Sequence, residues 1–476
     1  MTEQVVFNKI TQPSAYLGAS TSYKNKRKGL IHGDPDSIAA MEIANLQMRS
    51  ADLVRNNGYA KTGLTKYMTY LAAVKVNWTN SKGKKHKKMQ KFWEEFVANP
   101  NLDGHGTFAN TQSIINSSQF ITGNAYTRMM VQRTGNTNTV PLKLQAIPTE
   151  MHDIFYNGGA EEDNVKHGIK FDNSKPVTYY FRKGIYNHLW LGADNPFSVV
   201  SIPAEDIVHQ FIRESPGQWI GLPLLTSVIL NLYEVDELIE ATVAKQKAAQ
   251  AIAWIIENTN PMALTPTGAP GVETGENGED KIVFKASGGN TQYLNKGESI
   301  KFYQSTDIGK NLPLLIQAEL RRIAGAIGVP YHSLTGDTGD LAFSSLRAIS
   351  VEFRQRLEYI HHFYTIPLSI VPITNRFKEL AILYSSKVSD ATPTFQLPRW
   401  YGVDDLKDTQ ADVLELNYGL GTLQGKLDER HLTFEEAVES AGQIKELEAA
   451  LGRPLGGVSS THQSNNTKPN TNSTSL

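Results

Sequence analysis

Residues 223–257 read PLLTSVILNLYEVDELIEATVAKQKAAQAIAWIIE, and this stretch decides the architecture that the sequence predicts. Its apolar residues recur at intervals of three and four, at Leu224, Val228, Leu232, Val235, Ile239 and Val243. This spacing predicts one long α-helix with an apolar face, and Pro223 suits its first turn. At about 1.5 Å per residue the helix would span roughly 50 Å. Few globular domains need such a strut, whereas a helical bundle or the wall of a tunnel does.

The second half of this stretch is rich in alanine from Ala241 to Ala253, which would allow neighbouring helices to approach closely. Lys245 and Lys247 follow a group of acidic residues, in loose agreement with the helix dipole. Each lysine can face solvent, pair with an acidic residue of a neighbouring copy, or face a lumen. The stripe is too narrow and too charged for a membrane span.

Length and composition favour a protein of several domains without a membrane anchor. The chain has 476 residues, a formal net charge of -1 and no cysteine. By length alone we expect about two to four domains. The absence of cysteine excludes disulfides and cysteine-ligated zinc, and the neutral balance is unlike that of a general nucleic-acid binder. The sequence at the N-terminus lacks the apolar core of a signal peptide, so we expect a soluble, non-secreted chain without contact to a membrane.

The first 222 residues predict an α+β domain. Residues 1–36 are polar and basic, and we interpret them as a flexible arm that is either solvated or docked on an acidic partner or nucleic acid. Residues 36–76 predict two helices divided at Asn56-Asn57-Gly58 by a left-handed turn. Further helices are expected at 91–96 and 108–120, after an exposed lysine-rich turn at 82–88. Between 124 and 212, short β-branched and aromatic segments predict a sheet, with strands in AYTRMMVQ, LKLQAIP, DIFYN, HGIKFD, PVTYYFRK, HLWLG and DIVHQFI.

The sequence after the long helix predicts an inserted module and a second helix. Residues 258–311 contain a Pro- and Gly-rich segment and two predicted strands, KIVFKA and SIKFYQ. A helix with Asn311 as its cap then continues to Ile327. The two helices therefore bracket the module, and the simplest geometry is an antiparallel pair that carries it at the far end.

The remaining sequence predicts a loop, a third long helix and an acidic helical region. Residues 331–344 read YHSLTGDTGDLAFS, which predicts a Gly- and Asp-rich loop. A helix over 345–365 should be kinked or broken by Pro367 and Pro372, and helix should resume at 375–384. A strand is expected in TFQLPRW. Residues 404–451 predict acidic helices, with a capping box at Thr433 and Glu436, before a tail of disordered composition.

No stretch of the sequence predicts an active site. The phosphate-binding GxxxxGK[ST] and GxGxxG patterns are absent, as are GxSxG and HExxH. Asp337 and Asp340 in GDTGD could approach a hard cation, but the spacing lacks the closing glutamate of a calcium loop, and a simple turn is favoured. His361 and His362 are adjacent and would diverge on a helix. We therefore expect no cofactor and no metal, and favour a structural or conduit role over an enzyme.

Four stretches together resemble the portal proteins of tailed phages, in the lambda-like family. They are RSADLVRNNGYAKTGL (49–64), HGIKFDNSKPVTYYF (167–181), HQFIRESPGQWIGLPLLTSVI (209–229) and LRRIAGAIGVPYHSLTGDTGDLAFSSLRAISVEFRQRLE (320–358). The third is the most specific and places a hinge motif at Arg213, Pro216, Gly217, Gln218, Gly221 and Pro223. Two positions depart from the family pattern: Ile220 stands where arginine is common, and Ala342-Phe343 replaces Asn-Tyr. These departures leave open which contacts with DNA or a neighbouring subunit survive.

The resemblance implies a portal fold with named regions. It implies a wing over 37–222, a first stem helix over 223–257, a clip over 258–311 and a second stem helix over 312–329. A tunnel loop would occupy 330–344, wing structure would return over 345–403, and a crown would occupy 404–452, before a disordered tail at 453–476. The tunnel loop implies a DNA-channel set of Ser333, Leu334, Thr335, Asp337, Thr338, Asp340 and Phe343. Lys245 and Lys247 are candidate lumen charges.

The resemblance also implies partners and a location. It implies a homo-oligomeric ring, usually a dodecamer, at one capsid vertex of the virion, assembled in the host cytoplasm. Double-stranded DNA would pass through the ring without sequence specificity during genome packaging and ejection. Terminase, the major capsid or scaffold protein, and head-completion or adaptor proteins would dock on it. The alternatives from other classes are a nuclease or other enzyme of the packaging machinery, and another capsid-associated structural protein.

Overall fold

A computed structural model of the chain describes residues 33–71, 73–132, 140–158, 164–182, 199–251, 255–258, 272–274, 280–282, 298–301, 311–339, 342–397, 405–430, 432 and 434–451. The predicted arm up to residue 32, the predicted strand HLWLG, most of the predicted clip and the tail lie outside these residues. The chain divides into two compact units. The first comprises Met1–Lys61, Ser118–Tyr126 and Ile147–Ile327, and the second comprises Thr62–Ser117, Thr127–Ala146 and Gly328–Leu476.

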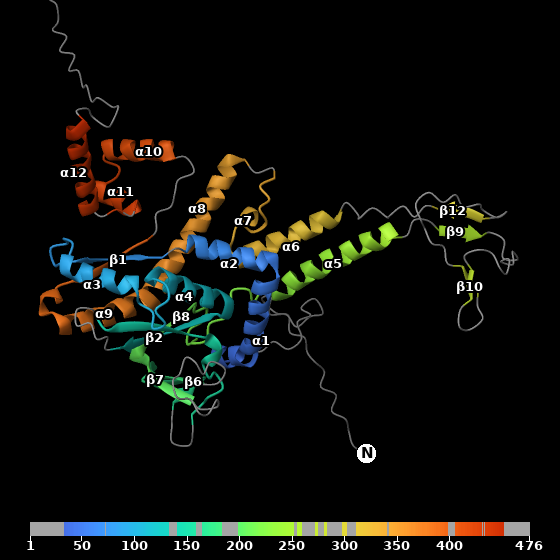
Figure 1. Ribbon diagram of the computed structural model, residues 1–476, viewed down its shortest axis with the longest axis horizontal. Coiled ribbons are helices and arrows are strands. Elements are labelled where there is room, and N and C mark those ends of the chain that lie inside the picture. The colour runs from blue at the N-terminus through green and yellow to red at the C-terminus, as the bar shows by residue number, and fades with distance from the viewer. Residues whose placement is uncertain are drawn as a thin grey trace, which may run out of the picture. The chain divides into compact units, whose positions relative to one another are not determined.

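Helices and strands are mixed along the chain, as expected for an α+β protein (Figure 1). The α-helices are α1 (Pro35–Asn56), α2 (Gly58–Tyr70), α3 (Lys87–Ala98), α4 (Phe108–Thr122), α5 (Ile229–Ala251), α6 (Asn311–Ile327), α7 (Tyr331–Thr335), α8 (Phe343–Ile360), α9 (Val371–Tyr384), α10 (Asp405–Asn417), α11 (Leu423–Glu429) and α12 (Phe434–Leu451). The strands are β1 (Lys75–Thr79), β2 (Asn124–Val131), β3 (Leu142–Ile147), β4 (Val165–Lys166), β5 (Ile169–Asp172), β6 (Lys175–Arg182), β7 (Val199–Pro203), β8 (Ile207–Phe211), β9 (Ile255–Asn258), β10 (Val272–Thr274), β11 (Asp280–Ile282), β12 (Glu298–Lys301) and β13 (Thr392–Gln396).

The core of the first unit lies on an antiparallel sheet of order β4-β5-β6-β7. Strand β6 pairs with β7 from Thr178↔Pro203 to Arg182↔Val199, and with β5 through a register shift at Lys170/Phe171. The alternation of side chains along these strands buries one face, which holds Ile169, Tyr179, Phe181 and Ile202. A further sheet has the order β3-β2-β8. This core supports the segment that leads from β8 into α5.

The second unit has an aromatic core. Strand β1 pairs with β13 from Lys75↔Gln396 to Thr79↔Thr392, although more than 300 residues separate them in sequence. The rings of Trp78, Trp93, Phe96, Phe108 and Phe377 pack against one another with centroids 4.9 to 6.2 Å apart. Burial of such large rings is the main stabilising contribution that a core of this kind can make. It joins the N-terminal α3 and α4 to α9 near the C-terminal part of the chain.

The long stem helix is shorter than its apolar spacing predicts. Helix α5 begins at Ile229, because the preceding residues form tight turns in which Thr226 N–H donates to Pro223 O and Val228 N–H to Leu225 O. It ends at Ala251, and Ile255–Asn258 is a strand rather than helix. The β-branched pair Ile255-Ile256 favours this strand, which pairs with β12.

Helices α5 and α6 form the expected antiparallel pair. They lie side by side in Figure 1, and the amide of Asn231 donates to Glu319 at 3.1 Å, which places the start of α5 beside the second half of α6. Strand β9, which follows α5, pairs with β12, which precedes α6, and β10 pairs with β11. The inserted segment is therefore β-rich and begins and ends on one strand pair, as predicted.

Three local predictions are wrong. Segment DIFYN is not a strand, because Tyr156 N–H donates to Asp153 O and closes a turn. Asn57 ends α1 in an extended rather than left-handed conformation, with φ -99° and ψ 126°. The loop predicted at 331–344 begins as helix α7, whose end is set by Gly336 at φ 77°.

The prolines near residue 370 do not break the third long helix. Helix α8 continues through a π-helix at His361–Ile370, which contains Pro367, and then into α9, where Pro372 lies in the first turn. Val371 N–H donates to Ile366 O, five residues earlier. The wider π turn relieves the clash that a proline ring makes with the preceding turn of an α-helix. The chain therefore remains helical from Phe343 to Tyr384.

Candidate functional site: the hinge, the stem hairpin and the loop

The hinge motif folds into a compact knot between β8 and α5. Gln218 is buried, its side-chain oxygen accepts from the amides of Glu214 and Ser215 at 2.8 and 3.0 Å, and its nitrogen donates to Ile220 O at 2.7 Å. Gly217 adopts φ 81°, which permits the turn. Pro216 is exposed at its tip. The side chain of Gln218 therefore satisfies the backbone groups that this irregular turn would otherwise leave unpaired.

Arg213 lies against the aromatic side of the hinge. Its guanidinium carbon is 4.9 Å from the centroid of the Trp219 ring and 5.7 Å from that of Phe211. A cation over an aromatic face is held by the ring quadrupole, and guanidinium groups stack well in this way. Arg213 thus fixes the orientation of Trp219, which also packs on Phe171 of β5.

Asp36 holds the hinge from the other side. Its carboxylate accepts from Trp219 N–H at 2.8 Å and from Ile220 N–H at 2.9 Å. Only 7% of Asp36 is exposed, and burial raises the pKa of its carboxyl, while the two amides act to lower it. The sequence marked Asp36 only as the start of a helix, because its partners lie more than 180 residues away.

Gly221 is required by a close approach of two backbones. A Cβ atom at Gly221 would lie 2.2 Å from Gly123 O, and one at Gly123 would lie 2.4 Å from Gly221 O. Asn124 seals this crossing, since its amide donates to Gly221 O at 2.9 Å and its oxygen accepts from Gly221 N–H at 2.8 Å. Asn124 was not predicted, and the Gly-Asn pair between a helix and a strand is the only local signal for it.

A buried network extends from Asn124 into the sheet core. His209 Nε2 lies 3.1 Å from the oxygen of Asn124, and its Nδ1 lies 3.4 Å from the hydroxyl of Tyr179. Burial lowers the pKa of His209 well below its usual value. The neutral ring that donates from Nε2 to Asn124 and accepts from Tyr179 satisfies every one of these groups. The hinge is therefore continuous with the core of the first unit.

The two candidate lumen lysines lie on the exposed part of α5. The side chains of Lys245 and Lys247 are exposed, whereas Leu232 and Val235 nearer its start are buried. Val243, which the apolar spacing assigns to the packed face, is 42% exposed. The lysines thus project from a stretch of α5 that its own subunit leaves open.

The predicted tunnel-loop residues separate into two groups. Ser333, Leu334 and Thr335 belong to α7, where Leu334 is buried. Asp337 and Thr338 are exposed after it, and Asp337 accepts from the Tyr331 hydroxyl at 3.2 Å and from Gly339 N–H at 3.0 Å. Asp340 lies outside the described residues, as does the side chain of Phe343, the first residue of α8. Asp337 is therefore a turn residue, in line with the simple-turn interpretation of GDTGD.

Two negative observations apply to the described part of the chain. Within it, no three His, Asp or Glu side chains lie close enough together to hold a metal ion. None of the helices that the structure describes is long and apolar enough to cross a membrane.

Comparison with known proteins identifies the family. The model of the phage portal proteins, lambda family, matches residues 25–361. The probable portal protein of Halomonas phage phiHAP-1 is 25% identical over 56% of this chain and 52% of its own length. The portal protein of Escherichia phage N15 is 21% identical over 61% and 60%, so the chain covers less than two thirds of either. Portal protein B of Escherichia phage lambda is 21% identical over 86% and 85%.

Solved structures give more distant matches. The neck of a native GTA particle computed with C12 symmetry is 15% identical over 85% of this chain and 95% of that one, with a TM-score of 0.47. An HK97 family phage portal protein from Corynebacterium diphtheriae is 15% identical over 72% and 94%, with a TM-score of 0.33. The match to the family model covers most of the chain and includes all of the hinge motif. The chain therefore belongs to the lambda family of phage portal proteins.

Proposed function

We propose that copies of this chain form a ring around a channel for double-stranded DNA at one vertex of a phage capsid. The ring serves genome packaging and ejection, is assembled in the host cytoplasm and remains in the virion. Membership of the portal family supports this function, and so does the absence of catalytic sequence patterns. We propose twelve copies, as the family resemblance implies.

The observation that carries the proposal is the antiparallel pair α5–α6, fixed at one end by the hinge and joined at the other by paired strands. Asp36, Asn124 and Gln218 leave the start of α5 little freedom, since each holds hinge backbone through two or more hydrogen bonds. Rigid rods of this kind suit the stem of a channel. Residues 37–222 and 345–403 then act as wing, 258–311 as clip and 404–452 as crown.

The DNA-facing residues in this proposal lie on the exposed parts of α5 and of the loop after α7. Lys245 and Lys247 face the lumen and form two rings of positive charge when the copies assemble. The segment from Thr335 to Phe343 forms the tunnel loop. Its short, sparsely charged sequence suits a sliding duplex, since each fixed cation on a phosphate adds affinity through counterion release.

Terminase docks on the clip in this proposal, and head-completion or adaptor proteins replace it after packaging. The major capsid or scaffold protein surrounds the ring. The test is to replace residues 259–297, between the paired strands β9 and β12, with a short Gly-Ser turn. Such rings should still assemble but fail to retain terminase in a pull-down. Undiminished terminase binding would show that another region provides the docking site.

The alternative of a packaging enzyme predicts measurable chemistry. ATP turnover or DNA cleavage by the purified chain, retained after ring assembly and removal of contaminating nuclease, would favour it. The proposed conduit predicts neither activity.

A further inference from the structure

The three C-terminal helices, α10, α11 and α12, leave most of their apolar side chains uncovered. Eleven large apolar side chains between Val413 and Leu451 are at least 42% exposed, whereas the rest of the described chain contains sixteen that exceed the exposure threshold. Leu427 is the single apolar residue of the described part of this segment that belongs to a buried core. Each exposed side chain forgoes roughly 25 cal/mol per Å² of burial. A partner surface is therefore needed to stabilise the segment.

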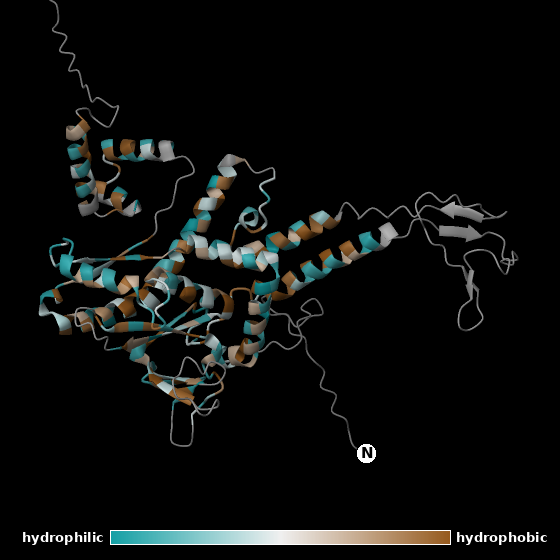
Figure 2. Ribbon diagram, viewed as in Figure 1, coloured by the Kyte–Doolittle hydropathy of each residue, from teal (hydrophilic) through white to brown (hydrophobic). Residues whose placement is uncertain are grey.

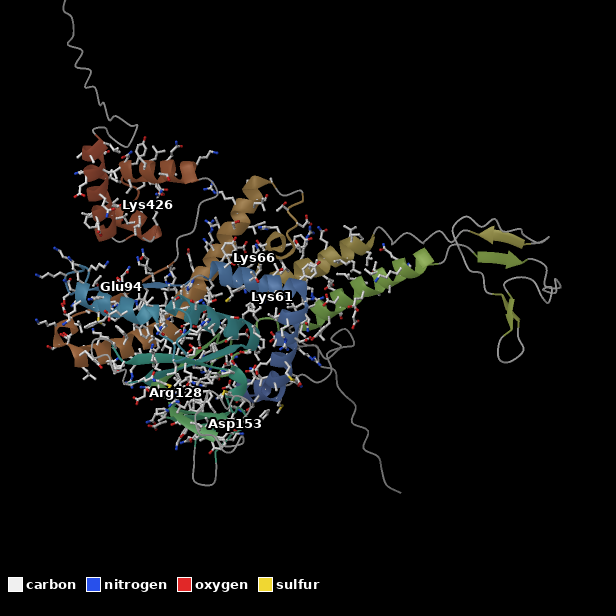
Figure 3. All side chains as sticks on the ribbon, in the orientation of Figure 1. Lys61, Lys66, Glu94, Arg128, Asp153 and Lys426 are labelled. Carbon is white, nitrogen blue, oxygen red and sulfur yellow. The ribbon has the colours of Figure 1, made fainter. Side chains whose placement is uncertain are left out.

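Ion pairs fix α10 on α11 and turn the acidic side of α10 inward. Lys426 of α11, labelled in Figure 3, lies 3.1 Å from Asp412 and 2.5 Å from Glu415. Arg430 also binds Asp412, at 2.7 Å. Because these acids face α11, the neighbouring Val413 and Leu414 face away from it, and they are 50% and 54% exposed. Tyr418, one turn beyond Leu414, is 76% exposed and extends this first apolar face.

Helix α12 carries a second apolar face. It packs on α11, and Val438, Ile444, Leu447 and Leu451 remain about half exposed along it. Their separations of three, four and six residues keep them on a broad stripe of one helix. Figure 2 shows brown turns alternating with teal ones on both outer helices. With α11 between α10 and α12, the segment presents two different apolar faces.

The charge of this segment excludes a polyanion as its partner. Residues 405–451 contain eleven Asp and Glu but four Lys and Arg. DNA would be repelled, and the exposed apolar side chains call for an apolar counterpart. A second copy of the segment supplies one, since each face of one copy can cover the other face of the next.

We infer that the first apolar face of one copy packs against the second apolar face of the neighbouring copy, so that α10–α12 close into a continuous helical collar. The inference rests on the proposed ring. A ring built by rotation needs two different, mutually complementary surfaces on each copy, and this segment has two. Paired faces would bury the side chains that the single chain exposes.

Cysteine crosslinking tests this directly, because the chain has no cysteine of its own. Copies with Tyr418→Cys are co-assembled with copies carrying Val438→Cys, and the purified rings are oxidised. A mixture of Tyr418→Cys with Ser440→Cys is the control, since Ser440 lies on the opposite side of α12 from Val438. We expect linked dimers from the first mixture and roughly tenfold fewer from the control, because a disulfide needs Cβ atoms about 3.8 Å apart.

Leu447→Asp provides a second measurement, since a charge on the covered face should dissociate the collar and abolish crosslinking between Tyr418→Cys and Val438→Cys copies. The inference is overturned when intact rings give no linked dimer in the mixture, or when Val438→Cys copies alone crosslink as efficiently. A preparation in which electron microscopy finds no rings contradicts the proposed function itself, so the two failures are distinguishable.

Discussion

The side-chain amide of Asn57 donates to the carboxylate of Asp236 at 2.8 Å, and this bond links the corner between α1 and α2 to α5. The oxygen of Asn57 accepts from Ala60 N–H at 2.8 Å and so caps α2. One buried residue therefore ends α1 in an extended conformation, begins α2 and holds the stem helix. Together with Asp36 and Asn124 it defines where α5 leaves the rest of the first unit.

Asn57→Ala should lower thermal stability. The substitution removes the cap of α2 and leaves the carboxylate of Asp236 without this donor, at a cost of about 1–3 kcal/mol. The matched control is Asn56→Ala, whose amide bonds only to Asp52 on the surface, and which should change stability by less than about 0.5 kcal/mol. Differential scanning calorimetry of both variants compares them. Equal melting temperatures would show that the Asn57 contacts contribute nothing.

Gly221→Ala should disrupt the hinge. The added Cβ would meet Gly123 O at 2.2 Å, and backbone cannot yield as a flexible side chain can, so a cost of about 3 kcal/mol or more is expected. Gly325→Ala is the control, since a Cβ there meets nothing within 4 Å inside α6. It should be neutral or should stabilise the helix by up to about 1 kcal/mol. Urea unfolding that finds both variants equally stable would contradict the close approach.

Acid should destabilise the first unit through His152. Its Nδ1 lies 3.0 Å from the Tyr126 hydroxyl, and burial lowers its pKa to about 4 from the model value of 6.5. The unfolded chain therefore binds a proton at a higher pH than the folded one, and stability is lost as pH falls from about 6.5 towards 4, by about 3 kcal/mol at most. His152→Gln should flatten the fall in melting temperature, whereas exposed His105→Gln should not. An unchanged slope in His152→Gln would refute the assignment.

Deleting Gly336–Asp340 should impair packaging or genome retention while the ring still forms. Thr335 is kept because its hydroxyl donates to Tyr331 O at 2.9 Å at the end of α7. Packaged DNA is measured by nuclease protection, with ring assembly measured by electron microscopy. Normal packaging by intact rings would show that the loop is passive.

Replacing Lys245 and Lys247 together with alanine should weaken DNA binding by assembled rings. If both line the lumen, the slope of log affinity against log salt concentration becomes shallower, because fewer counterions are released. Lys166→Ala, an exposed lysine on β4, is the control and should leave the slope unchanged. Identical slopes for all three proteins would remove the lysines from the lumen.

The helical hairpin with its inserted module could be predicted, whereas the hinge contacts could not. Periodicity reports which face of α6 is buried, and Leu320, Ile323 and Ile327 are buried as expected. Periodicity does not report where a helix stops when turns or strand pairing compete, so α5 was predicted too long. Asp36 and Asn124 act on residues far away in sequence, and no local pattern encodes such contacts.

The regions named by the family resemblance remain predictions for this chain. The hinge residues Arg213, Gln218 and Gly221 do lie together, and each has a structural reason there. Pro367 shows the opposite case, since a rule that holds for α-helices fails where a π turn makes room.

An electron-microscopy view of the purified protein down its symmetry axis tests the central proposal most directly. The account predicts a closed ring, of twelve subunits, with a central pore that α5 and α6 surround. Single copies alone, across a range of salt and protein concentrations, would contradict it.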